Sequence, residues 1–145
     1  MKQVNVSLKD LLNHPETEKV IKETVDDRLL YREGLEILSH SQLYQLLEGE
    51  KVIGFYTVDD EGDSEEIHVY IYPEHRRYSL RAFRYIKSRQ SKTIKTTVYG
   101  THFHVCKFLT RIGFSITGVQ SNRLVKNGEL HHVWELICSK ENSNG

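Results

Sequence analysis

The sequence predicts a mixed α/β fold, with a mostly antiparallel sheet flanked by helices. Short runs that alternate apolar and polar residues recur along the chain, as strands require. The stretch 79–89 instead repeats apolar residues every three positions, which is typical of an amphipathic helix. Near the end, Lys126-Asn127-Gly128 separates two strand-like runs, and Asn-Gly is a strong hairpin signal.

Length and composition favour a folded chain. The 145 residues have the size of one domain, and 38% apolar with 28% charged residues is too apolar for disorder. We expect a single domain over 1–140 and a flexible tail over 141–145. The formal net charge is zero, which argues against nucleic-acid and membrane partners. No apolar segment approaches the roughly 20 residues needed to cross a bilayer, and no signal peptide is recognisable.

The N-terminal third predicts a strand and two helices. Val4 and Val6 alternate with polar residues, and Ser7 can cap the helix that follows. Pro15 suits the first position of a second helix, which we expect over 16–30.

The middle of the chain predicts consecutive antiparallel strands. Two apolar runs within 43–58 flank a turn at 48–50, and a further strand covers 67–72. We expect the acidic segment 59–66 between them to be an exposed, mobile loop. In the strand 67–72, residues 67, 69 and 71 share one face, and His68, Tyr70 and Tyr72 share the other. A strand apolar or aromatic on both faces belongs inside the sheet.

The last half alternates helices and strands. In the helix over 79–89, Leu80, Phe83 and Ile86 form an apolar stripe that we expect to be buried. A strand over 93–99 follows, then a helix over 101–114 with Gly113 as its C-cap. The closing hairpin covers 114–138.

Charge is unevenly distributed. Segment 59–66 holds six acids, whereas 75–95 holds eight Lys or Arg and no acid. A solvated face is one interpretation of such a run, and an anion site at the turn 72–81 is the other.

Cysteine and histidine spacing predicts neither disulfides nor a metal site. Cys106 and Cys138 lie in apolar runs, as buried, reduced thiols of a cytoplasmic protein do. His102 and His104 are two apart on a predicted helix, and His131 and His132 are adjacent on a predicted strand, so neither pair shares a face.

The order of elements resembles that of the GNAT superfamily of N-acetyltransferases, over nearly the whole chain. Segment 71-IYPEHRR-77 is similar to the family's strand-ending V-x-P-x-x-R, and 108-FLTRIGF-114 to its "lYeklGF" element. Segment 118–136 resembles its last two strands. The resemblance implies a GNAT-like single domain whose central strands, ending at Tyr72 and beginning near Thr93, are parallel and splay apart after Tyr72.

The resemblance also implies a site for acetyl-CoA. The family binds the cofactor diphosphate at Gln/Arg-x-x-Gly-x-Gly/Ala, where N–H groups of a helix N-terminus face the phosphate. The cofactor-binding residues that it implies here are Ile71, Tyr72, Arg76, Arg77, Tyr78, Ser79, Leu80 and Arg81.

Arg81 stands where the family has a small residue. Ser79, at the preceding glycine position, is small enough to be tolerated. Arg81 has two interpretations: its side chain extends outward as a cationic clamp on the diphosphate, or it fills the space of the cofactor.

Acyl transfer to an amine needs a base for the ammonium and an acid for the thiolate. Many family members take the acid from the Tyr of lYeklGF, which is Leu109 here, and His102 corresponds to an Asn that often opens the same helix. The remaining hydroxyl donors are Tyr70, Tyr72 and Tyr99, and the candidate bases are Glu66 and His68. We therefore expect the catalytic residues to be Glu66, His68 and Tyr99.

The chain is also similar, in its size and in its FLTRIGF-type helix followed by a hairpin, to an acetyltransferase-like internal virion protein of some tailed phages. That protein also lacks the glycines of the diphosphate turn and the tyrosine of lYeklGF. Two functions follow from these resemblances. One is an acyl-CoA-dependent N-acyltransferase that acts by direct attack of an amine in a ternary complex. The alternative is a catalytically inactive GNAT-like domain that binds a protein partner, in a virion or against a host factor. Nucleic-acid binding is a third and weaker hypothesis.

Overall fold

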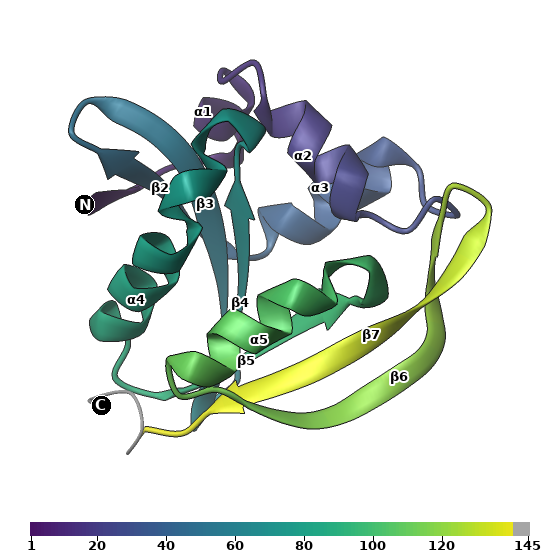
Figure 1. Ribbon diagram of the computed structural model, residues 1–145. Helices are drawn as coiled ribbons and strands as arrows, with labels where there is room; N and C mark the ends of the chain where they lie inside the picture. Colours follow the sequence, from purple (N-terminus) through teal and green to yellow (C-terminus); the bar gives the residue numbers. More distant parts are fainter. Residues whose placement is uncertain (141–145) are drawn as a thin grey trace.

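The computed structural model describes residues 1–140, except for the side chain of Thr101. One sheet runs through it in the order β1-β2-β3-β4-β5-β7-β6 (Figure 1). The strands are β1 Lys2–Asn5, β2 Gln42–Glu48, β3 Lys51–Asp60, β4 Ser64–Ile71, β5 Thr93–Tyr99, β6 Ser115–Lys126 and β7 Glu129–Cys138. The helices are α1 Leu8–Leu12, α2 Thr17–Thr24, α3 Tyr31–Ser39, α4 Ser79–Arg89 and α5 Phe103–Arg111, with 3-10 helices η1 Pro73–Tyr78 and η2 Gly100–His102. The tail expected over 141–145 lies outside the described residues.

The predicted fold class is confirmed. Neighbouring strands pair antiparallel except β4 and β5, which are parallel and are joined through η1 and α4. A crossover helix between parallel neighbours is the usual connection of this kind. Helices flank both faces of the sheet, as Figure 1 shows.

Two apolar cores lie on opposite faces of the sheet. One packs α4 and α5 against the sheet through buried residues that include Ala82, Ile86 and Leu109. The other packs the N-terminal helices through residues that include Leu11 and Ile21. β4 contributes to both, because Ile67, Val69 and Ile71 pack in the first core and Tyr70 and Tyr72 in the second. The predicted alternation of this strand is therefore confirmed.

The N-terminal helices differ from the prediction in number. Ser7 caps α1 as expected, and its hydroxyl accepts the N–H of Asp10. The predicted second helix is present, but the expected range 16–30 is too long, since α2 ends at Thr24 and a third helix, α3, begins at Tyr31. The chain between them turns because Asp26 and Asp27 bind the tip of the β6–β7 hairpin, about a hundred residues away.

The acidic segment is not a long loop. Asp59 and Asp60 belong to β3 and Ser64–Glu66 to β4, which leaves a turn of three residues. Two acids of the segment form ion pairs with lysines at the start of β5 and just before it. Lys92 Nζ is 2.8 Å from Asp60 Oδ1, and Lys95 Nζ is 3.7 Å from Glu61 Oε1. The expected mobile loop is therefore replaced by a short turn with ion pairs.

Helix α4 buries a different stripe from the predicted one. Leu80 is 38% exposed, whereas Ala82, Ile86 and Lys87 are buried. Lys87, one of the eight basic residues of 75–95, turns inward and donates from Nζ to the carbonyl oxygen of Ile112 at 2.5 Å. The contact joins α4 to the C-terminal end of α5.

The closing hairpin matches the prediction. Asn127 and Gly128 both have positive φ, at 53° and 78°, as the Asn-Gly turn between β6 and β7 requires. Cys106 and Cys138 are both buried free thiols. Within residues 1–140, no helix is long and apolar enough to span a bilayer.

Candidate active site

β4 and β5 separate at the centre of the sheet. Their parallel ladder runs only from Ser64↔Thr93 to Glu66↔Lys95, although β4 continues to Ile71 and β5 to Tyr99. The predicted parallel pairing and splay are both present. The separation begins after Glu66 and not after Tyr72, so the gap between the two strands is longer than expected.

The edge of β4 presents backbone groups to this gap. Tyr72 donates its N–H to Ile53 O at 2.9 Å, and the register pairs Ile71 with Gly54 and Val69 with Tyr56. Residues of an antiparallel strand direct their N–H and C=O groups alternately to one neighbour and to the other. Those of Val69 and Ile71 therefore point away from β3, toward the gap.

Gly54 permits the close approach of β3 behind the gap. An added Cβ at Gly54 would lie 2.2 Å from Tyr70 O and 3.0 Å from Ile71 Cα. The β2–β3 register also shifts here, because Leu46 pairs with Gly54 but Leu47 pairs with Val52. This bulge bends β3 around the part of β4 that β5 leaves.

A 3-10 helix occupies the predicted diphosphate turn. η1 follows β4 directly, Pro73 is at its start, and His75 N–H donates to Tyr72 O at 2.8 Å. The N–H of Ser79 donates to Arg76 O. The N–H and C=O of Tyr72 and the N–H of Ser79 thus form hydrogen bonds within the fold and are not directed at a ligand. The backbone groups of Ile71 face the gap.

Arg76 lies at the mouth of the gap. Its Nε–H donates to Ile71 O at 3.1 Å, and its Nη2 is 3.8 Å from Glu23 Oε2 at the end of α2. Its side chain is 53% exposed. The guanidinium therefore donates to one carbonyl oxygen that faces the gap, and the rest of the guanidinium stays exposed to solvent.

The other residues of the turn line its outer surface. The Arg77 guanidinium carbon lies 4.8 Å from the Tyr78 ring centroid, and its Nη2 donates to Tyr78 Oη at 3.1 Å. Ser79 begins α4 without a side-chain cap before it, and Leu80 is exposed.

The Arg81 side chain extends outward, is 58% exposed and pairs within the protein. Its Nη2 lies 2.8 Å from Glu48 Oε1 at the end of β2, two strands away from β4 in the sheet. The guanidinium is thus turned toward β2. The Cβ of Arg81 stays at the first turn of α4. A glycine at this position, as in the family, would have no Cβ.

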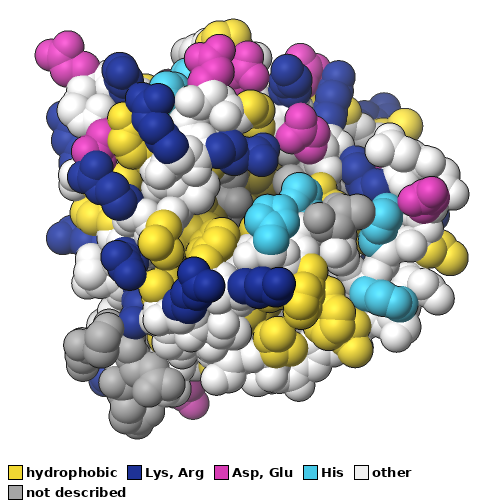
Figure 2. Space-filling model, viewed as in Figure 1, with side chains coloured by type: hydrophobic (Ala, Val, Ile, Leu, Met, Phe, Trp, Pro, Cys, Tyr) yellow, Lys and Arg dark blue, Asp and Glu magenta, His cyan; other side chains and the backbone are white. Residues whose placement is uncertain are grey.

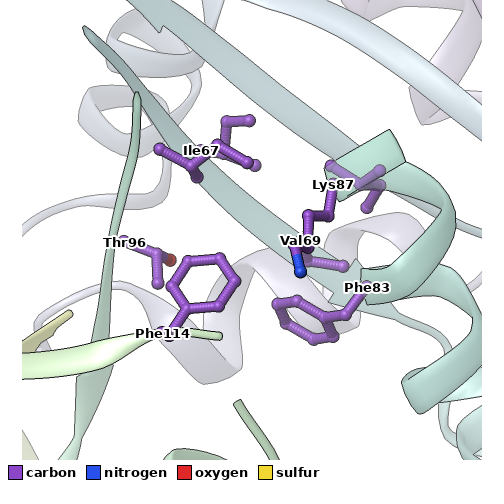
Figure 3. Close-up of a pocket in the computed structure, with 8 residues that line it drawn as sticks. Ile67, Val69, Phe83, Lys87, Thr96 and Phe114 are labelled. Carbon is purple, nitrogen blue, oxygen red and sulfur yellow. The ribbon is translucent and has the colours of Figure 1, made fainter. Parts of the chain in front are cut away.

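A small apolar cavity lies at the base of the gap, beneath α4 and α5. Ile67 and Val69 line it from β4, Thr96 lines it from β5, and Phe83 and Phe114 close it (Figure 3). The rings of Phe83 and Phe108 meet edge to face with centroids 5.5 Å apart, which joins α4 to α5. On this face of the sheet the gap is packed with side chains.

The predicted bases lie together on the other face. His68 Nε2 is 3.5 Å from Glu66 Oε1, and both side chains are about one-third exposed. The hydrogen bond to His68 lowers the pKa of Glu66 and outweighs burial, which raises it. Glu66 is therefore an ionised partner that holds the imidazole.

The three candidate tyrosines differ in their environments. Tyr72 is fully buried, its ring stacks on His14 at 4.1 Å, and its hydroxyl lies 2.8 Å from that of Thr17. Burial raises the pKa of Tyr70 to about 12, an effect that the Thr24 side chain opposes. Tyr99 donates from its hydroxyl to Glu23 O at 3.2 Å. Tyr70 and Tyr99 thus reach adjacent residues of α2, which covers this end of the gap.

Leu109 is fully buried in the α4–α5 core. It has no proton to donate, as the sequence indicates. His102 precedes α5 and lies next to Tyr99, with Nε2 2.8 Å from the Tyr99 hydroxyl.

The basic region extends further than the sequence prediction recognised. Residues 75–128 contain twelve Lys or Arg and no Asp or Glu, and they form η1, α4, β5, α5 and β6. In Figure 2, Lys and Arg side chains gather over α4 and α5 around an apolar patch. A count of the whole interval between Glu74 and Glu129 would have shown this asymmetry. Such a field attracts a polyanion.

Comparison with solved structures shows the fold of the N-acetyltransferases. A spermidine N-acetyltransferase from Vibrio cholerae, solved with CoA and spermine, superposes with a TM-score of 0.78 at 12% identity, covering 99% of this chain and 98% of that one. An N-acetyltransferase from Staphylococcus aureus superposes with a TM-score of 0.69 at 12% identity, covering 97% of each chain. No protein-family model and no curated protein matches. The comparisons lend no support to the likeness to phage virion proteins.

Proposed function

We propose that the protein is an acyl-CoA-dependent N-acyltransferase that transfers an acetyl group to an amine by direct attack. The observation that carries the proposal is the gap between β4 and β5. There, the N–H and C=O groups of Val69 and Ile71 point away from β3, along a part of β4 that β5 does not pair, and Ile71 O accepts from the Arg76 side chain. The pantetheine arm of CoA carries two amides and can pair with such an edge as an extra strand does.

The residues at the mouth of the gap fit a diphosphate. Arg76 and Arg77 are exposed arginines at the turn before α4, and the helix dipole adds positive potential at its N-terminus. The surrounding interval is free of acids from residue 75 to 128. Arg76 can exchange its carbonyl partner, Ile71 O, for a phosphate oxygen, since a charge-assisted bond is the stronger of the two.

The residues on the α2 face of the sheet fit amine deprotonation. Acetyl-CoA supplies an activated thioester when it is bound. Because Glu66 is ionised and hydrogen-bonded to His68, the imidazole is the better base, and Glu66 orients it. His68 accepts the amine proton, directly or through one water, as the amine nitrogen attacks the carbonyl carbon.

The acceptor is proposed only as an amine. The fold neighbour from Vibrio cholerae was solved with spermine, so polyamines belong in the first panel of acceptors, together with a lysine peptide and a peptide with a free N-terminus. The protein is expected to act in the cytoplasm.

Calorimetric titration and thermal unfolding with acetyl-CoA test the binding. A hundredfold excess of ligand over Kd stabilises the fold by about 2.7 kcal/mol, which appears as a higher melting temperature. Release of free CoA thiol in the presence of each amine tests transfer. Dephospho-CoA and free pantetheine serve as matched ligands that lack, respectively, the 3′-phosphate and the whole nucleotide.

A partner-binding domain without catalysis is the second candidate. It is favoured by the apolar Leu109 at the position of the family's tyrosine, which leaves no proton donor there. Absence of any response to millimolar acetyl-CoA would support this alternative and overturn the first proposal.

A further inference from the structure

Tyr99 and His102 form a hydrogen-bonded pair at the end of β5. The Tyr99 hydroxyl lies 2.8 Å from His102 Nε2, and the two rings meet edge to face with centroids 4.5 Å apart. The same hydroxyl donates to Glu23 O at 3.2 Å. Both side chains are half-buried, so the pair is shielded but not sealed from solvent.

The hydrogen bonds indicate which imidazole nitrogen carries the proton. Burial lowers the pKa of His102, and the nearby charges of His104 and Arg76 lower it further, whereas Glu23 opposes them. The imidazole is therefore neutral at pH 7 and has one N–H. Since the Tyr99 proton points to Glu23 O, His102 donates from Nε2–H to the phenol oxygen. His131 is a further titratable group against Tyr99, with ring centroids 6.3 Å apart.

The pair lies across the gap from β4, on the same face as the proposed base. Glu66 and Lys95 are the last register partners, and four residues further along each strand stand Tyr70 and Tyr99. Alternate residues of a strand share a face, so His68 and Tyr99 both project to the α2 side. A thioester in the gap would thus have a base on one strand and a phenol on the other.

We propose that Tyr99 is the general acid of the transfer and that His102 is its positioning residue. This rests on the proposed acyltransferase function. The amine nitrogen forms a C–N bond to the acyl carbon. As the C–S bond breaks, the Tyr99 O–H proton passes to the thiolate sulfur. The amine's proton goes to His68. The His102 N–H stabilises the phenolate until a solvent proton restores the phenol, and His68 returns its proton to solvent, so no proton is gained or lost overall.

Steady-state kinetics of three variants test the pair. Tyr99→Phe should lower kcat about 100-fold, as loss of a general acid does, with little change in KM. His102→Leu should lower kcat about 10-fold, whereas His102→Gln, which retains an N–H donor, should stay within about threefold of wild type. Tyr44→Phe is the matched control, because its hydroxyl bonds only Gln42 on β2 among the described contacts.

The pH dependence of kcat separates catalysis from a structural role. With Tyr99 as the general acid, kcat of the wild type should fall at alkaline pH, and His102→Leu should displace this limb to higher pH, because a hydrogen bond to the phenolate is lost. Tyr99→Phe should abolish this limb. A merely structural role would lower the melting temperature and leave the limb in place.

The outcomes separate this inference from the proposed function. If wild type releases no thiol with any amine, the acyltransferase proposal fails and the acid role of Tyr99 falls with it. If wild type turns over while Tyr99→Phe keeps its kcat and its alkaline limb, only the inference about Tyr99 and His102 is overturned.

Discussion

The Arg76 guanidinium donates its Nε–H to the carbonyl oxygen of Ile71, 3.1 Å away, across the turn that joins β4 to α4. The contact places a cation at the end of the β4 edge that faces the gap. Its Nη2 also approaches Glu23 of α2, at 3.8 Å. The turn, the strand edge and the N-terminal helices therefore meet at this one side chain.

Replacing Arg76 with Ala should weaken acetyl-CoA binding. A hydrogen bond to a charged group contributes about 1.5–3 kcal/mol, so the Kd for acetyl-CoA should rise by roughly 10- to 100-fold. The dependence of Kd on salt should also become shallower, because one cation–phosphate contact is gone. Calorimetry at two ionic strengths measures both effects.

Arg89→Ala is the matched control for Arg76→Ala. Arg89 is an exposed arginine at the far end of α4, so its loss changes the net charge equally without touching the turn. Tighter binding by Arg76→Ala would contradict the prediction, since it would mean that Arg76 blocks Ile71 O.

Two substitutions at Arg81 separate the guanidinium from the Cβ. Because Glu48 already holds the guanidinium at 2.8 Å and turns it toward β2, Arg81→Ala should leave the Kd for acetyl-CoA within about twofold. Arg81→Gly removes the Cβ as well and should tighten binding, because the diphosphate can then approach the backbone more closely. Glycine in the first turn of α4 costs up to about 1 kcal/mol of stability, so thermal unfolding without ligand is measured in parallel. A clear loss of affinity in Arg81→Ala would show that the arginine serves as a clamp.

The sequence predicted those parts of the fold that depend on local patterns. The alternation within β4 assigned its two faces correctly, and Asn127-Gly128 located the last turn. The end of α2 was not predictable in this way. Val20, Ile21 and Val25 keep a helical spacing, but Asp26 binds the hairpin tip and ends the pattern through a contact distant in sequence.

The candidate site was predictable only in its residue types. The proline and arginines of 71–77 indicated where a turn for an anion lies, but not that Arg81 would pair with Glu48 or that the gap opens after Glu66. Side-chain direction in an exposed turn depends on partners from other elements, and pairing within a sheet depends on the neighbouring strand. The contact between Tyr99 and His102 spans only three residues, but it depends on the 3-10 turn between β5 and α5, which no local motif marks.

Gly54→Ala should destabilise the fold severely. Its Cβ would lie 2.2 Å from Tyr70 O, a backbone atom that can move only if β4 shifts toward the gap. We expect a loss of about 3 kcal/mol or more in the free energy of unfolding, in the upper range for single substitutions. Gly49→Asn is the control, since nothing lies within 4 Å of a Cβ there and Asn tolerates the positive φ of 63°. Equal denaturant midpoints for the two variants would show that β3 and β4 are not held this closely.

The contact between the β6–β7 hairpin and the α2–α3 connection should open in acid. Asp27 accepts from Lys126 Nζ at 2.9 Å and from Asn127 N–H at 2.6 Å, and Asp26 accepts from Val125 N–H at 3.3 Å. Arg28 holds the pKa of Asp26 well below its ordinary value, and Lys126 lowers that of Asp27. A carboxyl whose folded pKa is depressed contributes stability above its unfolded pKa, about 3.9, and that contribution is lost as pH falls through the folded value.

Hydrogen exchange of the Val125 and Asn127 amides measures this opening. Protection should be constant from pH 7 to about 5 after correction for intrinsic exchange, and should fall below about pH 4, before the sheet unfolds. The double variant Asp26→Asn, Asp27→Asn should show the low protection already at pH 7, because both ionised acceptors are gone. Asp63→Asn, in the exposed turn before β4, serves as the control with unchanged protection. If the double variant kept wild-type protection at pH 7, the hairpin would be held by its strand pairing alone, and these carboxylates would have no part in fixing it to the α2–α3 connection.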